Sequence, residues 1–140
     1  MSAGKLYDEV IRKHNSHPYR FEKIDNCSTP IQANNFICGD QFEICLELNN
    51  DRISNIRFHG FGCAVSKAST SILVKGLEGK SRLEALQICN QFLRLLRNEA
   101  GTEEKLFSEE FRSFQVVQEV PSRYDCAALS WLEVEKFLQA

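Results

Sequence analysis

A length of 140 residues, with 43% hydrophobic and 26% charged side chains, suits one domain that buries a hydrophobic core without disulfide bonds. These fractions argue against a disordered or fibrous chain, so we expect a single domain over residues 1–140. The net charge of −2 gives no sign of the clustered basic surface that nucleic acid requires, and we expect no nucleic-acid partner.

The first half of the chain predicts one helix followed by antiparallel strands. Apolar residues recur at helical spacing over residues 5–14, whereas residues 42–48 alternate strictly between apolar and polar side chains, as in a half-buried strand. Turn-forming residues follow at 49–51, so residues 52–58 are expected to return as the second strand of a hairpin. The segment around Ile31 is a candidate for a further antiparallel strand.

The second half of the chain predicts helices. Residues 64–77 have helical spacing with many small side chains, which indicates a closely packed helix. The helix expected over residues 81–98 begins with a capping box, a serine followed three residues later by a glutamate, and a last helix is expected after Pro121. Residues 102–114 allow either a short helix or an irregular segment. This order of elements predicts an α+β fold, with helices packed on one face of a small antiparallel sheet.

Six cysteines are the main chemical feature of the chain. No run of 18 apolar residues is present and the N-terminal residues lack the apolar stretch of a signal peptide, so we expect a cytoplasmic protein with no membrane partner. In that reducing compartment, thiols bind metal or do chemistry more often than they form disulfides. Cys89 lies on the apolar stripe of its helix and is expected in the core, whereas Cys27 and Cys45 have no evident partner in the sequence.

Two of the remaining cysteines lie in local contexts that suit metal binding. Cys38 and Asp40 flank a glycine directly before the alternating strand, so a thiol and a carboxylate can converge on one ion. Cys63 follows two glycines and starts a helix, where free N–H groups and the helix dipole favour a thiolate, so we expect a lowered pKa.

Cys126 is the third candidate cysteine ligand, because it opens the last helix and has a guanidinium three residues away, on Arg123. Three thiolates and one carboxylate would suit tetrahedral Zn²⁺, and thiolates suit iron–sulfur clusters equally well. The spacing lacks the paired C-x-x-C knuckles of a zinc ribbon, and free cysteine is often simply a small buried side chain. Residue spacing alone therefore leaves the metal open.

Several segments resemble the SufU branch of the U-type iron–sulfur cluster assembly proteins, and together they cover nearly the whole chain. They are residues 6–11 (LYDEVI) with His14 and Pro18, 34–40 (NNFICGD), 58–69 (FHGFGCAVSKAS), 79–80 (GK) and 121–131 (PSRYDCAALSW).

The resemblance favours the SufU type over the IscU type. IscU-like proteins have a histidine directly before the third cysteine and a nearby Leu-Pro-Pro-Val-Lys segment, whereas this chain has Asp125 and the sequence VPSRY. SufU-like proteins also have an insertion before the third cysteine, and the long stretch between Cys63 and Cys126 has room for it. The chain departs from the family at Phe36, where proline is usual, and at Asp125, where a basic residue is more common.

The resemblance implies a zinc-dependent sulfurtransferase that acts with a pyridoxal-phosphate cysteine desulfurase of the SufS type. Zn²⁺ would be held by Cys38, Asp40, Cys63 and Cys126 until the desulfurase docks and frees one ligand. Cys38 would then take the persulfide sulfur, Arg123 would stabilise the anionic sulfur or the docked partner, and a downstream iron–sulfur assembly scaffold would receive the product.

Two alternatives remain open at this point. The same ligands would also suit a non-catalytic scaffold that binds iron and assembles a [2Fe–2S] cluster, or a purely structural zinc site.

Overall fold

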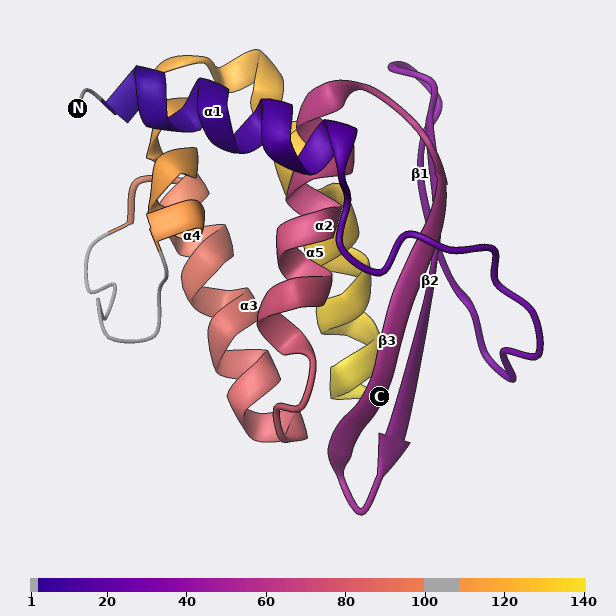
Figure 1. Ribbon diagram of the computed structural model, residues 1–140. Coiled ribbons are helices and arrows are strands. Elements are labelled where there is room, and N and C mark those ends of the chain that lie inside the picture. Colours follow the sequence, from indigo (N-terminus) through magenta and orange to yellow (C-terminus); the bar gives the residue numbers. More distant parts are fainter. Residues whose placement is uncertain (1–2, 100–108) are drawn as a thin grey trace.

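The sheet of the computed structural model, which describes residues 3–99 and 109–140, has three antiparallel strands (Figure 1). The strands are β1 (Ile31–Asn35), β2 (Asp40–Asn49) and β3 (Arg52–Phe61), in the order β1-β2-β3. The candidate strand around Ile31 is therefore confirmed. β3 is longer than expected because its residues pair with β2 as far as Phe61, opposite Gln41.

The β2–β3 hairpin follows from its sequence. Asn50 and Asp51 both have positive φ, 54° and 63°, a conformation that asparagine and aspartate tolerate better than most residues and that tight hairpin turns require. Along β2, the side chains of Phe42, Ile44 and Leu46 are buried on one face, as the alternation predicts. The hairpin thus turns an apolar face toward the helices.

Within the described residues, four long helices account for most of the chain outside the sheet, and each agrees with a predicted helix. None of the helices in the described residues is both long and apolar enough to cross a membrane. Part of the undecided stretch 102–114 is now assigned, from residue 109 on, and residues 102–108 lie outside the described part. The helical elements are α1 (Ala3–Ser16), α2 (Ala64–Leu77), α3 (Arg82–Leu96), α4 (Glu109–Ser113), the 3₁₀ turns η2 (Phe114–Glu119) and η3 (Pro121–Arg123), and α5 (Tyr124–Gln139).

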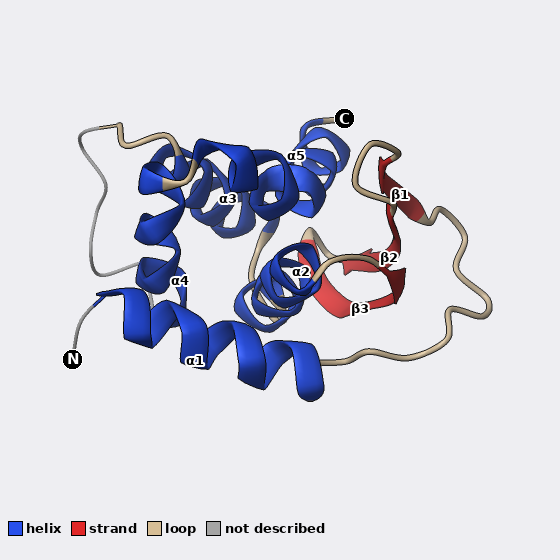
Figure 2. Cartoon of the chain, turned by 90° about the horizontal axis from the view of Figure 1, so that it is seen from above, coloured by secondary structure: helices blue, strands red, loops and turns tan. Residues whose placement is uncertain are grey.

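The helices cover one face of the sheet, as expected for this α+β fold. α2 contacts β3 and α5 contacts β1, while α1 and α3 pack farther out against those two helices (Figure 2). Trp131 of α5 is fully buried, stacks on Phe92 at 4.1 Å between ring centroids, and donates a hydrogen bond to Ser69 at 3.0 Å. These contacts join α2, α3 and α5 behind one end of the sheet.

Candidate metal centre

The turn between β1 and β2 presents Cys38 at the surface. Gly39 has φ 75°, a left-handed conformation that is strained for residues with a Cβ, and this lets the chain reverse between the two strands. Cys38 is exposed, whereas Asp40, the first residue of β2, is completely buried. The predicted compact turn before the strand is confirmed, and it places a free thiol above a buried carboxylate.

The Asp40 carboxylate is only half satisfied. Its Oδ1 atom accepts a hydrogen bond from the Cys63 amide at 2.8 Å, whereas Oδ2 is buried and has no hydrogen-bond partner within the described chain. A buried polar atom without a partner is costly, and a bound cation would remove that cost. Asp40 therefore suits a metal ligand on physical grounds.

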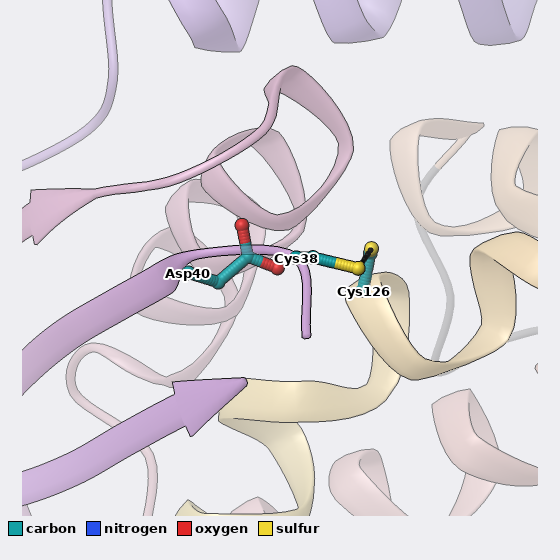
Figure 3. Close-up of side chains that lie close together, drawn as sticks. All are labelled: Cys38, Asp40 and Cys126. Carbon is teal, nitrogen blue, oxygen red and sulfur yellow. Dashed lines mark hydrogen bonds between the residues drawn. The ribbon is translucent and has the colours of Figure 1, made fainter. Parts of the chain in front are cut away.

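Three of the four predicted ligands converge in space (Figure 3). One ligand atom each of Cys38, Asp40 and Cys126 lies within 4.8 Å of the other two. The two sulfurs, of Cys38 and Cys126, are 3.8 Å apart. Two sulfurs bonded to one tetrahedral zinc at about 2.3 Å would be separated by about the same distance, so these donors fit the ion.

The fourth predicted ligand, Cys63, lies next to this cluster, outside the set of three mutually close atoms. It is the N-cap of α2, and its sulfur accepts a hydrogen bond from the Ser66 amide at 3.4 Å. The buried Ser66 hydroxyl is a further 3.5 Å neighbour of that sulfur. Cys63 thus starts the helix, as predicted, and one of the free N–H groups at the helix N-terminus donates to its sulfur.

Glycine at position 62 is a packing requirement of this site. A Cβ on Gly62 would lie 2.6 Å from Asp40 Oδ1, 2.8 Å from Phe42 Cε2 and 2.9 Å from Ser66 Oγ. No ordinary side-chain carbon approaches other atoms this closely. The absence of a side chain at position 62 therefore allows the Cys63 amide to reach the Asp40 carboxylate.

Cys126 has an environment that the sequence did not predict. Burial raises the pKa of its thiol, and hydrogen bonding with Cys63, the nearby Cys63 charge, hydrogen bonding with Cys38 and the Asp40 charge raise it further. The expectation that the helix start and the guanidinium of Arg123 favour a Cys126 thiolate is therefore wrong. A cation bound beside this sulfur would favour its thiolate form.

Arg123 points to a different neighbour. Its guanidinium carbon lies 5.8 Å from the centre of the Tyr7 ring, and its charge partly offsets the burial that raises the pKa of the Tyr7 hydroxyl. Arg123 itself is exposed, one residue before α5. Its predicted role toward the anionic sulfur stays a prediction.

Sequence reasoning missed the apolar surface beside Cys38. Phe36 and Ile37 are 78% and 98% exposed, although large apolar side chains are usually buried. They adjoin a shallow hollow that Asp125, Leu129 and Leu132 of α5 also line. The available signal was Phe36 itself, an aromatic residue where the resembling family usually has proline.

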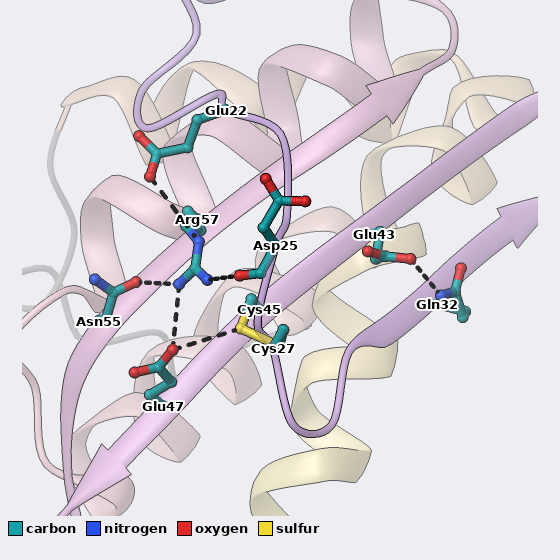
Figure 4. The surroundings of a disulfide bond; sticks show 9 residues. All are labelled: Glu22, Asp25, Cys27, Gln32, Glu43, Cys45, Glu47, Asn55 and Arg57. Atoms are coloured by element: carbon teal, nitrogen blue, oxygen red, sulfur yellow. Dashed lines mark hydrogen bonds and ion pairs between the residues drawn. A yellow bond between two sulfur atoms is a disulfide. The ribbon is translucent and has the colours of Figure 1, made fainter.

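The other cysteines lie apart from the cluster. Cys89 is fully buried in the core, as expected, and burial raises the pKa of its thiol. Cys27 and Cys45 are joined by a disulfide, which corrects the expectation of unpaired thiols (Figure 4). The pairing could not be foreseen because it depends on how the segment before β1 crosses the sheet.

Comparison with known proteins gives a consistent family. The family model of the NifU-like N terminal domain matches residues 6–105. The chain is 30% identical to the zinc-dependent sulfurtransferase SufU of Bacillus subtilis, covering 94% of this chain and 88% of that protein. It is also 30% identical to the iron–sulfur cluster assembly scaffold protein IscU of Streptococcus pyogenes, covering 90% and 78%.

A solved structure shares the whole fold. It comes from Fervidobacterium islandicum AW-1 and is described as an iron–sulfur cluster assembly scaffold protein for the SUF system. The TM-score is 0.86 at 26% identity, covering 98% of this chain and 99% of that one. The α+β fold is therefore shared over nearly the full length of both chains.

Proposed function

Because the chain belongs to the NifU-like N-terminal domain family, we propose that it is a zinc-dependent sulfurtransferase of iron–sulfur cluster assembly. In this proposal it accepts persulfide sulfur from a cysteine desulfurase through Cys38. The observation that carries the proposal is that Cys126 of α5 comes close to Cys38 and Asp40 of the β1–β2 turn, where one oxygen of the Asp40 carboxylate is buried without a partner in the described residues. The 30% identity to a zinc-dependent sulfurtransferase supports the choice of metal.

Of the four proposed ligands, one is exposed to solvent and the other three are buried or half-buried. Cys38 is exposed on its turn, whereas Asp40 and Cys126 are buried and Cys63 is half-buried. Bound Zn²⁺ would supply the positive charge that keeps the thiols deprotonated at neutral pH. The buried residues would hold the ion, and Cys38 is the ligand that another protein can reach.

The chemical step is a transfer of one sulfur atom between two cysteines. The Cys38 thiolate attacks the outer sulfur of a cysteine persulfide on the desulfurase. A new S–S bond forms on Cys38, the old S–S bond breaks, and the desulfurase cysteine leaves as a thiolate. Arg123, on the exposed turn before α5, would stabilise the anionic sulfur or the docked partner.

The surface around Cys38 suits delivery of sulfur by another protein. Phe36 and Ile37 project beside the thiol and would be covered by a docked partner. We propose a pyridoxal-phosphate desulfurase of the SufS type as that partner, and a downstream iron–sulfur assembly scaffold as the recipient. The proposed location is the cytoplasm, where a thiol relay stays reduced.

A second function, a scaffold that assembles a [2Fe–2S] cluster on the same ligands, has its own support. The chain is equally similar to a protein named as an IscU scaffold, and thiolates suit iron–sulfur clusters as well as zinc. Against it, the position before Cys126 holds an exposed aspartate where IscU-like proteins have a histidine. We therefore place the scaffold second.

Metal analysis of anaerobically purified protein, followed by a desulfurase assay, separates the two functions. The proposal predicts about one zinc per chain, no visible absorption bands and faster cysteine turnover when the protein is added. Cys38→Ala should fold normally and abolish the acceleration, and Cys89→Ala, outside the cluster, is the matched control. Iron with acid-labile sulfide, or full acceleration by Cys38→Ala, would contradict the proposal.

A further inference from the structure

The disulfide between Cys27 and Cys45 lies on the face of the sheet that the helices leave uncovered. Successive side chains of β2 point to opposite faces, so Cys45 points away from its apolar neighbours Ile44 and Leu46. It is nevertheless completely buried, because the segment between α1 and β1 passes over it (Figure 4). Cys27 belongs to that segment and is half-buried, so it is the more exposed cysteine of the pair.

The beginning of the segment is held by the backbone of β3. The Glu22 amide donates to the Phe58 carbonyl at 3.0 Å, and the Phe58 amide donates to the Arg20 carbonyl at 3.1 Å. From this edge of the sheet, residues 23–30 cross the outer face to reach β1 at the opposite edge, a path that Figures 1 and 2 both show.

The middle of the segment is attached to the sheet by the guanidinium of Arg57 and by the disulfide. Arg57 donates to the Asp25 carbonyl at 3.1 Å and forms ion pairs with Glu22 at 3.9 Å and Glu47 at 3.3 Å. It lies opposite Cys45 in the strand register. The Glu22 and Glu47 carboxylates are about half exposed, and ion pairs with exposed carboxylates are weak, so the covalent bond between Cys27 and Cys45 is the strong attachment at this point.

The disulfide also encloses part of the metal centre. The two cysteines are 18 residues apart, and the covalent loop they close contains β1 and the turn with Cys38 and Asp40. A crosslink restricts the conformations that such a loop can adopt. The bond therefore connects the outer segment to the hairpin that presents two of the candidate ligands.

We propose that Cys27 and Cys45 form a thiol–disulfide redox site, separate from the metal centre, that attaches the segment 23–30 to the outer face when oxidised and frees it when reduced. The co-reactant is a low-molecular-weight thiol such as glutathione. Two glutathione molecules give two hydrogens to the two sulfurs and become glutathione disulfide, and oxidation is the reverse exchange. In a reducing compartment, intracellular disulfides are typically transient or redox-sensing.

The other four cysteines lie in different places from the Cys27–Cys45 pair. Cys38, Cys63 and Cys126 gather around Asp40, and Cys89 is enclosed in the core. The partly exposed Cys27 is the sulfur that an incoming thiol can attack. Freeing the segment would also move Lys23 and Ile24, which form one wall of a surface hollow beside His59 and Phe61. The inference does not depend on which metal the protein binds.

Redox equilibration with peptide mapping tests the proposal on the full-length protein. The protein is held at a series of ratios of reduced to oxidised glutathione, free thiols are alkylated, and each cysteine is followed by mass spectrometry. Cys27 and Cys45 should become protected together as the mixture becomes oxidising, with a direct crosslink between their peptides. Labelling of both at every ratio, or crosslinks to Cys38 or Cys126 instead, would overturn the proposal.

Hydrogen exchange measures the structural consequence. Amides of residues 23–29 should exchange about tenfold faster in the reduced protein than in the oxidised one, because the covalent attachment is lost. Cys27→Ser should exchange fast in both conditions, and Cys89→Ser should keep the difference. Equal exchange in both states of the wild-type protein would show that the bond does not control the segment.

Discussion

The buried Asp40 carboxylate is the side chain that most strongly indicates a metal site. One carboxylate oxygen holds the Cys63 amide at 2.8 Å and the other is buried without a partner in the described structure. Proteins rarely leave a buried carboxylate oxygen unsatisfied, so this atom is the strongest physical indication of a cation between Cys38 and Cys126. The hydrogen bond between the Cys63 amide and Asp40 requires the backbone at Gly62 to lie close to the start of β2, and a substitution can disturb this contact.

Gly62→Ala tests that close approach. The new methyl group would overlap Asp40 Oδ1 at 2.6 Å and Ser66 Oγ at 2.9 Å, so the carboxylate must shift away from the Cys63 amide. We expect zinc affinity to fall about tenfold or more, which is about 1.4 kcal/mol of binding free energy. Competition with a chromophoric chelator measures the affinity. Gly4→Ala, where a Cβ meets nothing within 4 Å, is the control, and unchanged affinity in Gly62→Ala would contradict the account.

At the residue scale, the sequence predicted the positions of the candidate ligands better than their electrostatics. Cys38 at a turn and Cys63 at a helix start follow from local patterns, and the structure places both there. The raised pKa of Cys126 depends on burial by distant segments, which no local pattern reports. Their roles as ligands remain predictions.

A buried polar cluster joins three helices on the side of the molecule away from the sheet. His14 of α1 is 2% exposed and bonds through Nδ1 to the Ser71 hydroxyl of α2 at 2.7 Å, and through Nε2 to Glu110 of α4. Lys75 of α2 also donates to Glu110, at 2.9 Å. The Ser71 hydroxyl accepts from the Tyr19 amide at 2.7 Å, so the cluster fixes the chain after α1 as well.

Glu110 makes this helix contact pH-dependent. Burial alone would raise the pKa of its carboxyl, but hydrogen bonds from Lys75 and His14 and the charges of both lower it to about 2. A carboxyl whose pKa is lowered by folding stabilises the fold fully above its unfolded value, about 4.5, and loses that contribution as the pH falls toward 2. The contribution is about 1 to 2 kcal/mol after allowance for partial exposure.

The test compares wild type with Glu110→Gln, both metal-free, by urea denaturation at a series of pH values. The wild type should be more stable at pH 7, and the difference in unfolding free energy should shrink between about pH 4.5 and pH 2 because the native carboxyl becomes protonated. A difference that is constant over this range would show that the Glu110 charge does not stabilise the helix contact.

Helices were predicted correctly from the sequence where a short run of neighbouring residues marks the start of the helix. α3 begins with the capping box in which Ser81 and Glu84 each accept the other's amide, a pattern complete within four residues. The α4 and η2 segment gave no such signal: Phe111 and Phe114 are three residues apart, as in a helix, but no cap of this kind marks where a helix begins. Its conformation depends on packing against α1 and α3, which the sequence does not display.

For the whole molecule, the core and the candidate metal centre are largely independent. The buried apolar cluster draws on the sheet and on the helices α1, α2, α3 and α5, whereas the ligand atoms lie at one end of the sheet. Small domains that fold only around zinc lack a core of this kind. We therefore expect the molecule to stay folded without a bound metal.

Removal of zinc by a strong chelator tests this independence. We expect the far-ultraviolet circular dichroism to be retained and the melting temperature to fall by several degrees, because a ligand that binds only the native state adds stability. Stimulation of the desulfurase should be lost at the same time. Unfolding on chelation would instead indicate a purely structural zinc site.

The most direct test of the central claim is to locate the transferred sulfur. Zinc-loaded protein is incubated with cysteine and a catalytic amount of a SufS-type desulfurase, persulfides are trapped by alkylation, and peptides are analysed by mass spectrometry. The account predicts one added sulfur atom on Cys38, and none on Cys63, on Cys126 or in a reaction without the desulfurase. Added sulfur on a buried ligand in place of Cys38, or on no cysteine of this chain, would contradict it.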